Sequence, residues 1–292
     1  MFDNLQDATL VLVGHGATEN RESAAAVQAQ GAVLRARGLF REVLECFWMV
    51  EPRLTEVWSR IRTRAVYVVP VTISDGYFTT EVIPTQLGLN CNGPSAAGRI
   101  HEVHGHQVFY CRPIGSHPSM PGVLLARARQ TLADYPVLPP AEPGSTALFI
   151  AGHGTERNRQ SRVAIERQVQ LIRDRGLYAE VHAAFMMEAP FITDCWNVTA
   201  LGDLVMVPFF ISNGLHTAED IPILLGQAED GVRQRVRRGE AGWQNPIRCG
   251  CRRLWYTAAL GTDPHLADII VERVQESESS WILREDEGPA EP

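Results

Sequence analysis

The chain carries one sequence twice, and this internal duplication restricts its fold more than any other feature does. Adding 138 to a residue number in the first half gives its counterpart in the second, so that Gly14-His15-Gly16 corresponds to Gly152-His153-Gly154. From Leu10 to Gly88 the correspondence needs no gap, and 31 of the 79 positions are identical. A period of this length indicates two copies of a whole domain rather than a solenoid of small repeats.

Each copy alternates apolar strands with helical segments, the pattern of a parallel sheet with helices on both faces. In the first copy the predicted strands are 9–13, 42–48, 65–73 and 107–111, and the predicted helices include 24–37, 52–62 and 118–132. The segment 90–106, rich in Gly, Asn, Ser and His, is predicted to be a loop or small excursion. We therefore expect an α/β protein with two tandem, doubly wound parallel-sheet domains.

Prolines mark the boundary between the copies. Residues 135–145 hold four prolines and a glycine, which continue neither a helix nor a strand ladder. We expect a first domain at 1–138, a linker at 139–145 and a second domain at 146–278. An acidic, frayed tail is expected at 279–292.

Composition narrows the range of partners. The formal net charge of −7 has the wrong sign for a general nucleic-acid binder. The apolar runs are shorter than the roughly 20 residues that span a bilayer, and the first residues lack the features of a signal peptide. We predict a cytoplasmic protein, monomeric or homodimeric, without nucleic-acid or membrane partners.

Six cysteines in a chain of this size do not indicate a disulfide framework. Cys249 and Cys251 form the one close pair, and together with Cys91 and Cys111 they could hold an iron–sulfur cluster. We favour a structural role for these four residues, because nothing in the sequence brings them together.

Two histidines at strand ends of the second copy are the residues expected to carry chemistry. His153 follows the apolar strand 147–151 between two glycines, and His216 follows an apolar run that begins at Leu204. Because the first and third strands of a doubly wound sheet are close neighbours, both imidazoles should lie at the same sheet edge. Two imidazoles with a nearby carboxylate suit a borderline divalent ion such as cobalt, nickel, iron or zinc.

Three acids are candidates for that carboxylate. Glu188 follows the second strand of the copy, whose carboxyl end must lie at the same edge. Glu219 and Asp220 lie three and four residues after His216, where the helix macrodipole also favours acids in a first turn. The macrodipole explanation fits Asp220 better than Glu219, so Glu188 and Glu219 are the predicted assisting residues.

The first copy lacks most of this polar set. Phe78 stands for His216, Val50 for Glu188 and Val82 for Asp220, whereas His15 and Glu81 are kept. A fold that accepts these apolar residues does not need the polar ones for folding, so we predict that the site is in the second copy. The first copy would supply an apolar wall for a flat aromatic ligand, with Tyr77, Phe78 and Trp48 as candidates.

Three motifs resemble the class II tetrapyrrole chelatases of the CbiX type, the family of sirohydrochlorin cobaltochelatase and ferrochelatase. They are Gly-His-Gly after a first strand, Val-Pro-Phe-Phe-Ile-Ser-Asn-Gly-Leu-His-Thr-Ala-Glu-Asp-Ile-Pro at 207–222, and Cys-Arg-Pro-Ile-Gly at 111–115. The resemblance implies two flavodoxin-like domains facing each other, with a tetrapyrrole in the cleft between them. It also implies that His153 and His216 hand over a divalent metal substrate, with Co²⁺ first and Fe²⁺ or Ni²⁺ as alternatives.

The activity that this resemblance implies is that of a lyase, the insertion of the metal into sirohydrochlorin in cobalamin or siroheme biosynthesis. Arginine forks suit the carboxylates of such a substrate, and Arg157 and Arg159 follow the Gly-His-Gly turn. On the side of the first copy, the candidate substrate-binding residues are His15, Tyr77 and Phe78.

Two other functions stay open at this point. The chain could be a non-catalytic protein that stores or delivers a metal or a metallotetrapyrrole. A flavin carrier is disfavoured, because His stands between the glycines where a phosphate-binding loop would carry Ser and Thr. The histidines at 101, 104 and 106 we interpret as part of a solvated loop rather than as a metal-delivery patch.

Overall fold

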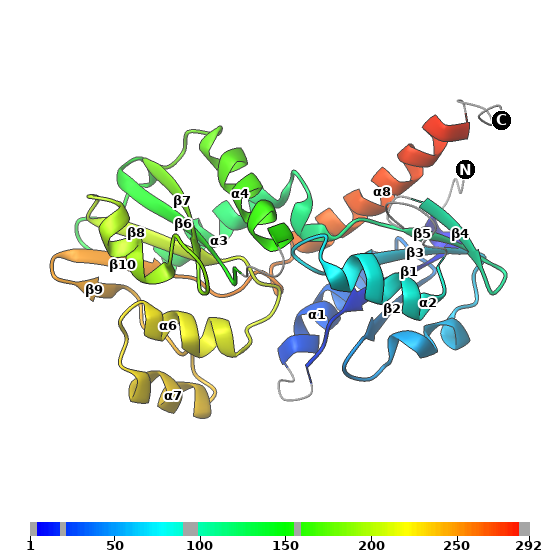
Figure 1. Cartoon of the computed structure of the whole chain (residues 1–292), viewed down its shortest axis with the longest axis horizontal. Coiled ribbons are helices and arrows are strands. Elements are labelled where there is room, and N and C mark those ends of the chain that lie inside the picture. Colours follow the sequence, from blue (N-terminus) through cyan, green and yellow to red (C-terminus); the bar gives the residue numbers. More distant parts are fainter. Residues whose placement is uncertain (1–4, 18–21, 90–98, 155–158, 286–292) are drawn as a thin grey trace. The chain divides into compact units, whose positions relative to one another are not determined.

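The computed structural model describes residues 5–17, 22–89, 99–154 and 159–285, and in it the chain forms two compact units (Figure 1). The first unit comprises Met1–His117 and Pro264–Pro292, and the second comprises Pro118–Asp263. Each unit holds one five-stranded, mostly parallel sheet. The predicted α/β class with two tandem sheets is therefore confirmed.

The sheet of the first unit has the strand order β2-β1-β3-β5-β4, and β4 is antiparallel to β5. The strands are β1 (Ala8–Gly14), β2 (Glu42–Phe47), β3 (Ala65–Pro70), β4 (Arg99–Val103) and β5 (His106–Tyr110), and the helices are α1 (Glu22–Arg37), α2 (Ile83–Leu87) and α8 (Leu266–Glu285). The expected helix at 52–62 is a 3₁₀-helix at Leu54–Arg60.

Part of the segment 90–106, predicted to be a loop or small excursion, forms the strand β4. His104 and Gly105 both have positive φ, 51° and 81°, which makes a tight two-residue turn. This turn brings Val103 opposite His106 and lets β4 pair with β5. The loop propensity of residues 99–103 is outweighed by their pairing with β5, which a local sequence pattern does not reveal.

The second unit repeats this arrangement with the strand order β7-β6-β8-β10-β9. Its strands are β6 (Thr146–Gly152), β7 (Glu180–Phe185), β8 (Asp203–Pro208), β9 (Ile247–Cys249) and β10 (Arg252–Tyr256). Its helices are α3 (Met120–Asp134), α4 (Arg159–Arg173), α5 (Cys195–Val198), α6 (Ile221–Leu224) and α7 (Glu229–Arg237). The central strands β1 and β6 are buried along their whole length, as expected for strands covered on both faces.

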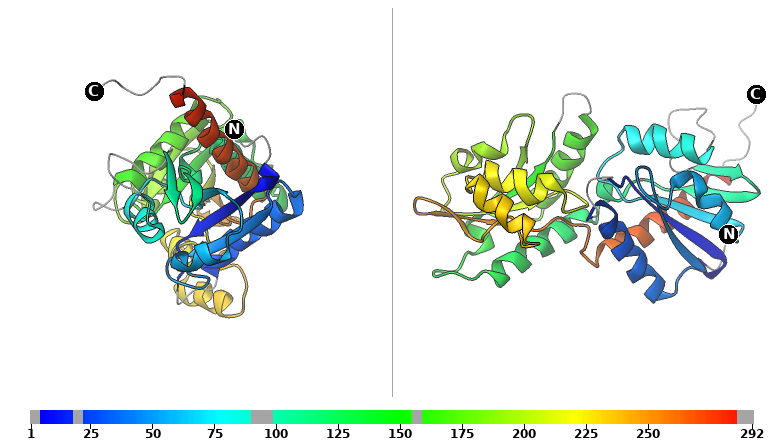
Figure 2. Two further views of the ribbon diagram at one scale, coloured as in Figure 1. Left: turned by 90° about the vertical axis from the view of Figure 1, so that its right-hand side faces the viewer. Right: turned by 90° about the horizontal axis from the view of Figure 1, so that it is seen from below.

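Two helices cross from one copy of the sequence to the sheet of the other. Helix α3 follows β5 in the chain but packs against β8, β10 and α4 of the second unit. Helix α8 follows β10 but packs against β3, β5 and α1 of the first unit, and Figure 2 shows α8, in orange and red, beside the blue α1. Each unit therefore contains the last helix of the other copy.

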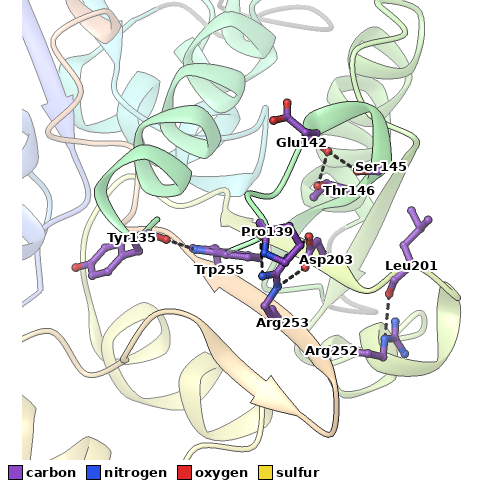
Figure 3. Close-up of polar contacts among 10 residues, drawn as sticks. All are labelled: Tyr135, Pro139, Glu142, Ser145, Thr146, Leu201, Asp203, Arg252, Arg253 and Trp255. Atoms are coloured by element: carbon purple, nitrogen blue, oxygen red, sulfur yellow. Dashed lines mark hydrogen bonds and ion pairs between the residues drawn. The ribbon is translucent and has the colours of Figure 1, made fainter. Parts of the chain in front are cut away.

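Polar contacts hold the segment after α3 to the second unit (Figure 3). The indole Nε1 of Trp255 donates to the carbonyl oxygen of Tyr135 at 2.9 Å. Arg253 donates to the carbonyl oxygen of Pro139 at 3.0 Å and to both carboxylate oxygens of Asp203 at 2.6 Å. The proline-rich segment thus lies on the sheet that follows it.

The compact units do not coincide with the domains expected from the repeat. The compact units divide after His117 and after Asp263, whereas the sequence placed the division at 139–145. The reason is tertiary: α3 and α8 each bury a face on the sheet of the other copy, which local sequence does not specify. At the C-terminus the helix α8 extends to Glu285, beyond the expected domain end at 278. Among the described residues, no helix is both long and apolar enough to cross a membrane.

Candidate functional site

His153 lies in a turn whose shape requires glycine. Gly154 has a φ of +66°, and a Cβ there would lie 2.8 Å from Cβ of Phe185 and 2.8 Å from Cγ of Glu188. The imidazole Nδ1 of His153 lies 2.8 Å from the carbonyl oxygen of Gly154. Because a carbonyl oxygen only accepts, Nδ1 is the donor, and in the neutral imidazole Nε2 then keeps its lone pair.

His216 begins a π-helical turn, His216–Asp220, directly before α6. We call it the second π-turn, and the equivalent Phe78–Val82 of the first unit the first π-turn. Such turns are rare and occur often at functional sites. The Nδ1 of His216 lies 2.7 Å from Oδ2 of Asp220, so its Nε2 is also the nitrogen left for a ligand.

The structure brings the two predicted histidines together. The ring centroids of His153 and His216 are 5.0 Å apart, with an angle of 68° between the planes. Both Nδ1 atoms are engaged by neighbouring oxygens. The two Nε2 atoms, one from each turn, are therefore the nitrogens that could coordinate a metal at this sheet edge. In the described part of the chain no group of three or more His, Cys, Asp or Glu is arranged to hold a metal ion. The pair alone would leave most coordination positions of a metal open to a second set of donors.

Asp220 is the residue that sequence reasoning undervalued. Its carboxylate contacts His216, whereas the carboxylate of Glu219 faces Arg233 at 3.7 Å from Nε. The four-residue spacing between His216 and Asp220 was available in the sequence, since residues at i and i+4 of a helical turn are neighbours. The macrodipole explanation obscured it.

Glu188 lies beside the Gly-His-Gly turn, as its place after β7 predicts. Its Oε2 pairs with Nη1 of Arg162 at 3.0 Å, and its Oε1 is buried without a hydrogen-bond partner among the described residues. Arg162 also donates to the carbonyl oxygen of Ala189 and lies over the ring of Phe185. A buried carboxylate oxygen without a partner is costly, and a bound ligand or water would remove that cost.

Of the two arginines predicted to bind substrate carboxylates, the structure describes one. Arg159 is exposed at the first residue of α4. Arg157 lies outside the described residues.

In the first unit the equivalent turn is surrounded by aromatic rings. His15 keeps the backbone contact, with Nδ1 2.7 Å from the carbonyl oxygen of Gly16. Its ring centroid lies 5.1 Å from Phe78 and 5.0 Å from Trp48. Tyr77, next in the chain to Phe78, is 68% exposed. The rings of Trp48 and Phe78 thus lie beside the imidazole of His15, and the apolar wall for a flat ligand stays a prediction.

The cysteine and histidine clusters considered from sequence give no assembled site among the described residues. Cys111 is buried, and burial raises the pKa of its thiol to about 12, which disfavours the thiolate that a metal needs. Cys249 and Cys251 are exposed at the turn between β9 and β10. Cys91 lies outside the described residues.

The three histidines near β4 do not form the solvated loop expected from sequence. His101 is buried, and His106 stacks on Trp58 with centroids 5.7 Å apart. The Nδ1 of His106 lies 2.7 Å from the carbonyl oxygen of Thr63. His104 is exposed at the turn and lies 5.8 Å from Trp58, so the three side chains have three different environments.

Comparison with known proteins adds evidence from both sequence and structure. The CbiX family profile matches residues 9–131 and 147–277. A protein of Halobacterium salinarum named "Probable sirohydrochlorin cobaltochelatase" is 36% identical over 283 residues, 92% of this chain and 91% of that protein. The sirohydrochlorin cobaltochelatase of Methanopyrus kandleri is 27% identical over 139 residues, which are 45% of this chain and 96% of that protein.

Among solved structures, a multi-domain protein of Deinococcus radiodurans with structural similarity to chelatases gives a TM-score of 0.73 at 30% identity. The match covers 91% of this chain and 54% of that one, so this chain spans about half its length. A CbiX described as the terminal enzyme of siroheme biosynthesis in denitrifying bacteria gives a TM-score of 0.59 at 20% identity. That match covers 92% of this chain and 97% of the other, and it supports the fold alone.

Proposed function

Because this chain belongs to the CbiX family, we propose that it inserts a divalent metal ion, Co²⁺ before Fe²⁺ or Ni²⁺, into sirohydrochlorin or a closely related tetrapyrrole. The observation that carries the proposal is the pair His153 and His216, whose rings are 5.0 Å apart and whose Nε2 atoms are both left for a ligand. The metal is a substrate here, and the enzyme acts as a lyase.

The reaction asks two things of the protein, and neutral imidazoles suit both. The incoming ion must be held while it exchanges its ligands for four pyrrole nitrogens, and two pyrrole protons must be accepted. The Nε2 lone pairs of His153 and His216 bind the ion first and accept protons as it leaves them. Asp220 fixes the tautomer and orientation of His216, as an outer carboxylate does for metal-bound histidines.

Glu188 is the assisting carboxylate that the contacts favour. Its buried Oε1 lies beside the His153 turn, where it can take a proton from an imidazole or from the substrate. Glu219, which sequence reasoning treated as its equal, is directed toward Arg233. We assign Glu219 a supporting role in the second π-turn.

For the tetrapyrrole we propose two kinds of contact. Arg157 and Arg159 would bind its peripheral carboxylates through their guanidinium forks. In the first unit, Phe78, Tyr77 and His15 would present an aromatic surface to the macrocycle.

Metal insertion into sirohydrochlorin, followed by absorbance with Co²⁺, Fe²⁺ and Ni²⁺ in turn, tests the proposal. His216→Ala is expected to lower the rate by roughly 10³-fold, since it removes a ligand and a base together. His104→Asn, at an exposed hairpin turn, is the control for loss of a histidine elsewhere. Stoichiometric Co²⁺ binding by the wild-type protein without turnover would instead support a storage or delivery protein.

A further inference from the structure

The second π-turn leaves one buried carbonyl without its helical partner. In an α-helix the N–H of Ile221 would bond to the carbonyl oxygen of Thr217, four residues back. Here it bonds to the carbonyl oxygen of His216, five residues back. The next N–H that could reach Thr217 would be that of residue 222, and this residue is a proline, which has none. Thr217 is 1% exposed, so water does not readily replace the missing donor.

A tyrosine from another strand supplies the donor. The hydroxyl of Tyr256, the last residue of β10, donates to the carbonyl oxygen of Thr217 at 2.9 Å. Tyr256 is fully buried, and its own backbone is held by Asn245, which accepts from its N–H at 2.9 Å and donates to its carbonyl oxygen at 2.8 Å. Trp243 packs edge-on against the phenol ring. The phenol is therefore fixed relative to the sheet.

We propose that Tyr256 is a positioning residue for metal capture: its hydroxyl fixes the backbone of the second π-turn from which His216 extends toward His153. The inference rests on the proposed function of this site. Thr217 is the residue next to His216, and its own hydroxyl donates back to the carbonyl oxygen of Gly214 at 3.0 Å. Thr217 is thereby anchored through both its carbonyl oxygen and its side chain, which fixes the backbone next to His216.

In the first unit a tyrosine supports the first π-turn in the same way, but the side chain at the position of His216 is different. The hydroxyl of Tyr110 donates to the carbonyl oxygen of Thr79 at 2.5 Å, and Pro84 removes the alternative donor. The side chain that this turn presents is Phe78, which is not a metal ligand. Tyr110→Phe therefore makes the same chemical lesion as Tyr256→Phe in a turn without the imidazole.

The experiment compares these two variants by titration with Co²⁺ alone. Tyr256→Phe is expected to weaken Co²⁺ binding roughly 10-fold, because a small displacement of a ligating side chain lowers the affinity of a metal site strongly. Tyr110→Phe should leave the Co²⁺ affinity unchanged, while both variants lower Tm by similar amounts. In turnover assays, Tyr256→Phe should reduce kcat for Co²⁺ insertion without a matching rise in KM for the tetrapyrrole.

Equal weakening by the two variants, or full Co²⁺ affinity in Tyr256→Phe, would overturn the positioning role. Asn245→Ala is a second variant that releases the same phenol without altering it, and it should weaken Co²⁺ binding in the same direction. The titration does not require turnover. Wild-type protein that binds Co²⁺ but never inserts it would overturn the proposed function and leave the positioning role measurable.

Discussion

Phe78 and His216 occupy the same place in two copies of one turn, and the turns differ in chemistry while sharing their support. Both turns are followed by a proline. In both, the hydroxyl of a buried tyrosine donates to the carbonyl oxygen of the threonine that follows Phe78 or His216. His216 faces Asp220 and His153, whereas Phe78 packs on His15 and Trp48. The backbone devices thus belong to the scaffold, whereas the proposed metal chemistry would depend on a few side chains placed on it.

Both units keep the histidine of the Gly-His-Gly turn in the same orientation. In each unit its Nδ1 contacts the carbonyl oxygen of the following glycine, at 2.7 Å for His15 and 2.8 Å for His153. One oriented imidazole is therefore common to the two units. What distinguishes the second unit is the second imidazole with its carboxylate.

Removing that shared histidine from each unit in turn should have the most unequal effect. His153→Ala is expected to reduce kcat/KM for Co²⁺ insertion by roughly 10³-fold, since a ligand and a proton acceptor are lost together. His15→Ala should cost less than about 10-fold, because its ring packs among aromatic side chains and would contact only the substrate surface. Steady-state rates measure both, and comparable losses would contradict the assignment of the site to the second unit.

Asp220→Asn tests whether the carboxylate behind His216 matters. A loss of about 10- to 100-fold in Co²⁺ affinity or insertion rate is expected, as for other partners of metal-binding histidines. Glu219→Gln, one residue away, should have the smaller effect because its carboxylate faces Arg233. If Glu219→Gln proves the more damaging in calorimetric titration, the roles inferred from the contacts are reversed.

The comparison can also be tested by adding chemistry to the first unit. In Phe78→His/Val82→Asp the new imidazole would stand near His15, whose ring centroid is now 5.1 Å from that of Phe78. Equilibrium dialysis should then show two bound Co²⁺ per chain instead of one, the second with weaker affinity. Phe78→His/Val82→Asn is the matched control that lacks the carboxylate. A stoichiometry that stays at one would mean that the scaffolds differ in more than these side chains.

The smallest expected effect concerns the two places where the chain crosses between units. His117 contacts Glu276 at 3.0 Å and Glu272 at 3.3 Å on α8, and its counterpart Asp263 pairs with Arg127 on α3 at 3.5 Å. Burial, and then the charge of Arg273, lower the pKa of His117 below its ordinary value. The folded state therefore binds this proton less readily than the unfolded state does.

Stability from this group is complete above the ordinary pKa of histidine, about 6.5, and falls as the pH drops through that value. We expect Tm to decrease between pH 7.5 and 5.5 by more in the wild-type protein than in His117→Gln. Thermal unfolding followed by circular dichroism measures the difference. Parallel pH dependences of the two proteins would show that another group is responsible.

Much of the arrangement of the candidate site was accessible to sequence reasoning. The duplication and the strand–turn–helix pattern placed His153 and His216 at one sheet edge, because parallel strands end together. Comparing the copies separated residues required by the scaffold from those that it tolerates losing. The hydrogen-bond partner of His216, Asp220, was ranked below Glu219, since two adjacent acids could satisfy the same pattern and only side-chain directions distinguish them.

The sequence by itself determined that there are two sheets, which strands deliver histidines and which copy holds the polar set, because periodicity and turn chemistry are local. Only the tertiary structure decided that α3 and α8 pack on the sheet of the other copy and that Tyr256 supports the turn of His216. These contacts join residues far apart in the chain. They follow from which apolar faces can be buried together and which buried carbonyls still need a donor, and neither leaves a pattern in neighbouring residues.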